Sequence, residues 1–157
     1  MDSALAMRDS ATPISWRPTR AESAMPVVQR RILFAGGEAV EAELEVSDAA
    51  PWTIRAEIPR LGAVTRQAPD LFEALAELRT WLAARDALVL VQGAARDVYP
   101  SGMAREAGGR MAYRFRDGKP ATRADIVDIL APAEPGAVAN VAEQRENFES
   151  WIRSLKA

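Results

Sequence analysis

The sequence predicts an α+β fold in which an antiparallel sheet is covered on one face by two helices. Two runs of segments alternate apolar with polar residues, as half-buried strands do. A segment with apolar residues three and four positions apart follows each run, and turn residues separate the segments. The expected order is therefore β-β-β-α-β-β-β-α. The length of 157 residues fits one domain, which we expect at residues 27–157. Residues 1–26 show little periodicity and are expected to form a flexible N-terminal arm.

The first run predicts three strands. A strand at 27–35 ends at Gly36-Gly37, a turn signal. In the second strand, four apolar residues alternate with polar ones: Val40, Ala42, Leu44 and Val46 with Glu41, Glu43, Glu45 and Ser47. The same alternation from Trp52 to Ile58 predicts its hairpin partner. Residues 59–69 are expected to form a loop, with at most a short edge strand at 63–66.

A helix is predicted from Leu71 to Arg85. Leucines recur there on one helical face, at positions 71, 75, 78 and 82. Asp70 precedes the helix as a candidate N-cap, with Glu73 at capping-box spacing. The apolar face is expected to lie on the sheet.

The second run begins with the apolar segment 87–91, which predicts a central strand. A long connection follows, residues 93–109. Alternation at 111–116, the turn signal Asp117-Gly118 and an apolar stretch at 124–130 predict a hairpin. Apolar residues at helical spacing between Val138 and Leu155 then predict a second helix.

Composition excludes several chemistries. The chain has no histidine and no cysteine, which excludes a Ser-His-Asp triad, a thiolate nucleophile, disulfides and His- or Cys-ligated metals. These gaps weigh against an enzyme, and the sequence predicts no cofactor and no metal. No apolar run is long enough for a membrane span. No export signal is evident, so the expected compartment is the cytoplasm.

The connection 93–109 concentrates charged residues, hydroxyl groups, a proline and glycines in one segment. Long connections on a rigid sheet are often functional. The candidate binding residues are Arg96, Asp97, Tyr99, Ser101 and Arg105. A structural interpretation stays open, in which Arg96 pairs with Asp97 and Ser101 caps a short helix at Met103–Glu106.

Two charge clusters are further candidates. Glu41, Glu43 and Glu45 form an acidic stripe, which is either a solvated strand face or a docking surface for a basic partner. Residues 96–123 carry seven basic residues against three acidic ones, which leaves nucleic-acid binding as an alternative. The overall net charge of −2 gives no general affinity for nucleic acid.

The connection also carries a resemblance. Its residues read Gly-Ala-Ala-Arg-Asp-Val-Tyr-Pro-Ser-Gly-Met from Gly93 to Met103, followed by Gly109, Tyr113, Val127-Asp128-Ile129, Val141-Ala142-Glu143-Gln144-Arg145 and Trp151. This pattern resembles a family of small bacterial proteins of unknown function, over most of residues 27–155. The resemblance implies a shared domain and assigns no catalytic residue.

The sequence thus favours a non-catalytic, protein-binding module, of the immunity or adaptor type by analogy of class. The alternatives are a protein or enzyme that handles a small anionic ligand at the 93–109 connection, and nucleic-acid binding by residues 96–123. The sequence leaves the partner and the oligomeric state open.

Overall fold

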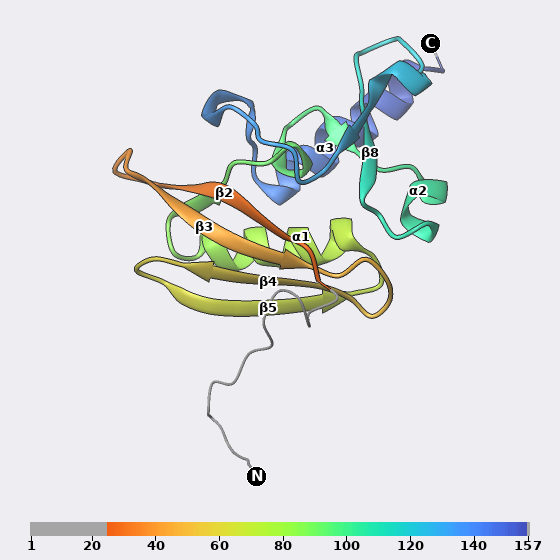
Figure 1. The fold of residues 1–157 in the computed structure, drawn as a ribbon. Coiled ribbons are helices and arrows are strands. Elements are labelled where there is room, and N and C mark those ends of the chain that lie inside the picture. Colours follow the sequence, from red (N-terminus) through yellow and green to blue (C-terminus); the bar gives the residue numbers. More distant parts are fainter. Residues whose placement is uncertain (1–24, 157) are drawn as a thin grey trace.

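The computed structural model of this chain describes residues 25–156. The expected arm, residues 1–26, therefore lies outside the described residues except for its last two. Within residues 25–156 the fold class is confirmed, with eight strands in antiparallel pairs and three α-helices. The strands divide between a five-stranded and a three-stranded sheet, where the sequence predicted a single sheet (Figure 1).

The five-stranded sheet has the order β5-β4-β3-β2-β6. Its strands are β2 (Val27–Phe34), β3 (Ala39–Val46), β4 (Trp52–Ile58), β5 (Gly62–Ala68) and β6 (Ala87–Val89). The alternation predicted on β3 and β4 is confirmed, because Ala42, Leu44 and Val46 are buried together with Ile54 and Ile58. The glutamates between them lie on the opposite face.

Helix α1 (Leu71–Ala83) packs against β4, β5 and β6 and covers the apolar face of this sheet. The predicted N-cap is confirmed, because an Asp70 carboxylate oxygen accepts a hydrogen bond from the backbone N–H of Glu73 at 2.8 Å. All four leucines of the predicted stripe are fully buried. The helix and the inner faces of the strands thus form one core.

Two expectations for this sheet are wrong. Residues 59–69 are mainly strand and not loop: the short edge strand expected at 63–66 is present at the edge of the sheet, but as the seven-residue β5, which pairs with the whole of β4. The segment 87–91 is not a central strand, because β6 is three residues long and lies at an edge beside β2. It is apolar because α1 packs against β6 and residues 129–133 lie beside residues 90–93: the N–H of Ala133 donates to the carbonyl oxygen of Leu90.

The three-stranded sheet has the order β7-β8-β9, formed by β7 (Val98–Tyr99), β8 (Met111–Arg114) and β9 (Ile126–Asp128). Helix α2 (Gly102–Glu106) lies between β7 and β8 in the chain, and helix α3 (Val141–Ser154) packs on β7. The returning strand is shorter than predicted because residues 123–125 form a single helical turn. Helix α3 begins three residues later than expected, after the N-cap residue Asn140.

Candidate functional site

The connection 93–109 is fastened to the domain by a buried cross-link between two helices. The side-chain nitrogen Nε2 of Gln144 on α3 lies 2.8–2.9 Å from the carbonyl oxygens of Gly93, Ala95 and Val98, and these three acceptors share its two N–H groups. Its amide oxygen accepts a 2.7 Å hydrogen bond from Nη1 of Arg79 on α1. Gln144 is 1% exposed and Arg79 is 7% exposed. Burial lowers the pKa of Arg79 to about 10, so its guanidinium stays charged at neutral pH.

Gly93 lies where this connection approaches the core most closely. A Cβ at this position would lie 2.5 Å from Cδ2 of Leu75 and 2.8 Å from Cβ of Ile129. We expect Gly93→Ala to lower the free energy of unfolding by about 1–3 kcal/mol, because the core has to make room for the methyl group. The matched control is Gly136→Ala, where a Cβ meets nothing within 4 Å. Denaturant unfolding of both variants measures the difference, and equal values would contradict the tight contact.

Arg96 and Asp97 do not pair with each other. Arg96 donates to the carbonyl oxygens of Gly136, at 2.6 Å, and Val138, at 3.4 Å. The carboxylate of Asp97 lies 3.3 Å from Nε of Arg114. Both side chains therefore attach the connection to neighbouring segments.

Tyr99, Ser101 and Arg105 are brought together where α1, α2 and α3 meet. The hydroxyl oxygen of Ser101 accepts from the N–H of Ala104 at 3.0 Å, which confirms it as a helix cap. Nη2 of Arg105 lies 3.4 Å from the hydroxyl of Tyr99, and its Nη1 lies 3.2 Å from a carboxylate oxygen of Asp70. Tyr99 and Ser101 of this cluster line a pocket, and Arg105 does not.

The pocket has a volume of about 440 Å³ and lies between β7, β8 and α3. Five aromatic residues line it: Tyr99, Tyr113, Phe115, Phe148 and Trp151. The rest of the wall is Pro120, Ala121, Ile152 and Leu155, with Ser101 and Gly102 at the α2 end. Neighbouring rings pack on each other, with centroids 4.2 Å apart for Tyr99 and Phe148 and 5.4 Å apart for Phe115 and Trp151. We call this space the aromatic pocket.

The aromatic pocket suits an apolar group. No charged side chain lines it. The indole N–H of Trp151 already donates to the carbonyl oxygen of Lys119 at 2.8 Å, and the Ser101 hydroxyl is used as a cap. Among residues 25–156, no group of three or more Asp or Glu residues is placed to hold a metal ion. The walls therefore offer contact area rather than acid–base chemistry.

The sequence did not indicate the pocket: among its lining residues only Tyr99 and Ser101 were candidate binding residues, and Phe115 and Trp151 are also buried, each at 8% exposed. One signal was available. Helix α3 presents Phe148, Trp151, Ile152 and Leu155 on one side, more large apolar surface than the short strands β7 and β8 can cover.

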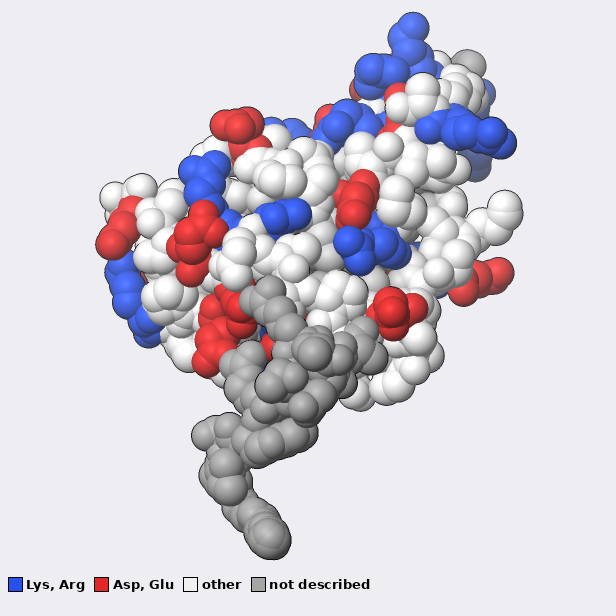
Figure 2. Space-filling view, in the orientation of Figure 1, with Lys and Arg blue, Asp and Glu red and all other residues white. Residues whose placement is uncertain are grey.

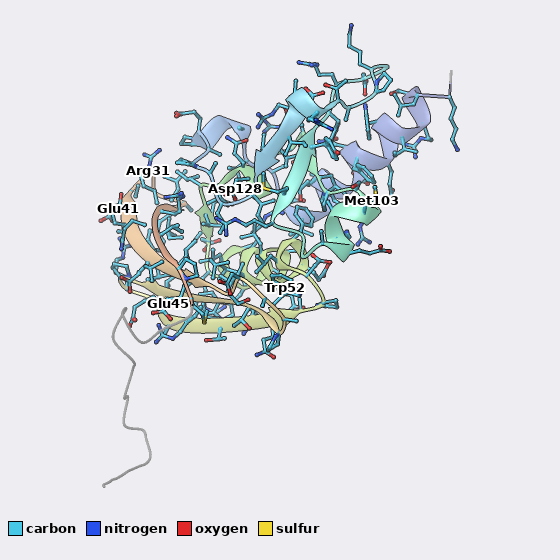
Figure 3. All side chains as sticks on the ribbon, turned by 45° about the vertical axis from the view of Figure 1, so that its right-hand side comes forward. Arg31, Glu41, Glu45, Trp52, Met103 and Asp128 are labelled. Atoms are coloured by element: carbon cyan, nitrogen blue, oxygen red, sulfur yellow. The ribbon has the colours of Figure 1, made fainter. Side chains whose placement is uncertain are left out.

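The acidic stripe lies on a separate surface. Glu41, Glu43 and Glu45 are on the face of the five-stranded sheet opposite α1, far from Met103 on α2 (Figure 3). Across the strands, Arg31 of β2 lies opposite Glu41, and Arg55 of β4 lies opposite Glu45. The structure thus does not join the two groups of predicted site residues into one site.

Only the geometry of the aromatic pocket indicates what it binds. The chain matches no protein-family model and no curated protein sequence. Over residues 25–156, no helix combines the length and the apolar character that crossing a membrane requires.

Proposed function

We propose that this chain is a non-catalytic binding protein that receives an apolar anchor side chain of a partner protein in the aromatic pocket. The observation that carries the proposal is an open space of about 440 Å³ with aromatic and aliphatic walls and no charged lining residue. Anchor side chains in such pockets dominate the affinity of many protein interfaces. An adaptor or an immunity-type protein would use the pocket in the same way, and the cytoplasm stays the expected compartment.

The surroundings favour a protein partner over a small molecule. Met103, on the short helix beside the pocket, is 76% exposed. Methionine is enriched in the cores of protein interfaces, and an exposed one extends the apolar surface beyond the pocket mouth. A small ligand needs polar groups that fix its orientation. The Trp151 N–H and the Ser101 oxygen are already hydrogen-bonded within the chain. The hydroxyl groups of Tyr99, Tyr113 and Ser101 are therefore the only polar side-chain groups that the wall offers for this purpose.

Gly102 offers a way to fill the pocket without disturbing the fold. It lines the pocket, its backbone is unstrained, and a Cβ there meets nothing within 4 Å. We expect Gly102→Leu to leave thermal stability unchanged and to abolish partner binding, because the new side chain occupies the space meant for the anchor. Gly136→Leu is the matched control, since it is equally open and lies outside the pocket.

The measurement is affinity capture of the tagged full-length chain from its native cells, followed by titration of the purified partner. A stoichiometric protein that is retained by wild type and Gly136→Leu and lost by Gly102→Leu supports the proposal. A second filling variant from the opposite wall, Ala121→Phe, should behave like Gly102→Leu. Native mass spectrometry that finds a small molecule displaced by both filling variants would establish a ligand-binding protein instead.

A further inference from the structure

The surface around the aromatic pocket is basic. Five exposed cations lie on the two segments that supply much of its wall, residues 115–125 and 151–156: Arg116, Lys119, Arg123, Arg153 and Lys156. Figure 2 shows Lys and Arg side chains gathered at the upper right, where Figure 1 places the C-terminal end of α3 and the connection from β8 to β9. We call these five residues the basic tip.

Little of this charge is neutralised within the chain. The two segments hold only two acidic residues, Asp117 and Asp125. The Asp125 carboxylate lies 3.3 Å from Arg116 and also accepts a hydrogen bond from the backbone N–H of Thr122. The other four cations of the basic tip form no ion pair with any residue in the described range 25–156. On α3, the acidic residue nearest in sequence is Glu149, one turn before Arg153.

We infer that the anchor belongs to an acidic segment of the partner, whose Asp and Glu side chains lie over the basic tip while the anchor fills the aromatic pocket. This inference rests on the proposed function and names the chemistry of the partner. The argument is charge complementarity at the pocket mouth: Pro120 and Ala121 of the wall lie between Lys119 and Arg123 in the chain, and Ile152 and Leu155 alternate with Arg153 and Lys156.

The arrangement of the rings favours carboxylates over a nucleic acid. Single-stranded nucleic acids bind by stacking bases on exposed aromatic faces. Here the ring of Tyr99 is stacked on that of Phe148, and the ring of Phe115 on that of Trp151, which covers one face of each ring. Phe115 and Trp151 are moreover each only 8% exposed, so little of their second faces is open to a base. An apolar side chain needs only contact with the walls, whereas a base needs a free ring face.

The test selects short random peptides displayed on phage against the full-length chain. Peptides that bind wild type and fail to bind Gly102→Leu are synthesised and titrated by fluorescence polarisation, at about 50 mM and about 200 mM salt. Two triple variants with the same change of net charge are compared. Lys119→Gln/Arg123→Gln/Arg153→Gln removes cations of the basic tip, and Arg31→Gln/Arg60→Gln/Arg85→Gln removes exposed arginines elsewhere.

We expect the selected peptides to combine an aromatic or aliphatic anchor with several Asp or Glu residues. At low salt the tip variant should bind them about tenfold more weakly, and the control triple variant should bind like wild type. If the peptides that depend on the pocket are neutral or basic, or bind the tip variant as tightly as wild type, the inference of an acidic partner segment is wrong and the proposed function of the pocket still holds. If no peptide depends on the pocket, both proposals fail. Tighter binding of single-stranded oligothymidine through the same residues would replace the acidic segment with a nucleic acid.

Discussion

Gln144→Leu is expected to lower the free energy of unfolding by about 3 kcal/mol or more. The substitution keeps the approximate side-chain volume and removes every hydrogen bond of the amide. The carbonyl oxygens of Gly93, Ala95 and Val98 then lose a buried donor. Nη1 of Arg79 loses its 2.7 Å acceptor and keeps only a longer hydrogen bond, at 3.3 Å, to the carbonyl oxygen of Gly93. A buried polar group left unpaired costs about 1–3 kcal/mol, and a charged one costs more. Urea denaturation followed by tryptophan fluorescence measures the change.

The control for this substitution is Asn147→Leu on the same helix. Asn147 also donates from its side-chain amide to the connection, to the carbonyl oxygen of Arg96 at 3.2 Å, and this hydrogen bond is exposed. Water can replace it, so we expect a cost of about 1 kcal/mol or less. If the two substitutions cost the same, the buried cross-link would not be what holds the connection in place.

The strands and helices were predictable where a periodic pattern was strong. The alternation of β3 and β4 and the leucine stripe of α1 follow from local burial, and the sequence alone indicated all three elements. The position of β6 was not predictable in this way. An apolar segment has the same pattern in a central strand and in an edge strand that other residues cover. Here α1 packs against β6, and residues 129–133, which are distant in sequence, lie beside residues 90–93.

The candidate site was predictable only in part. The 93–109 connection stands out by its composition, and Tyr99 and Ser101 do line the aromatic pocket. The residues that hold the connection in place could not be predicted. Gln144 lies among charged residues on a helix, and nothing in the sequence pattern of that helix indicates that it is buried. Its partner Arg79 is 65 residues away. Such a pair is recognised only when the fold brings the two helices together.

The connection 93–109 also packs closely against the start of α1 at Gly109. We expect Gly109→Ala to lower the free energy of unfolding by about 3 kcal/mol. Its φ of +76° costs any side chain about 1–2 kcal/mol, and a Cβ would also lie 2.8 Å from Oδ1 of Asp70, the N-cap of α1. Gly118→Ala separates the two causes, because its φ is +75° and a Cβ there meets nothing within 4 Å. Its expected cost is the strain alone, about 1–2 kcal/mol. If the two variants lose the same free energy of unfolding in denaturant, the Asp70 side chain must move away from the new methyl group at no cost to the helix cap.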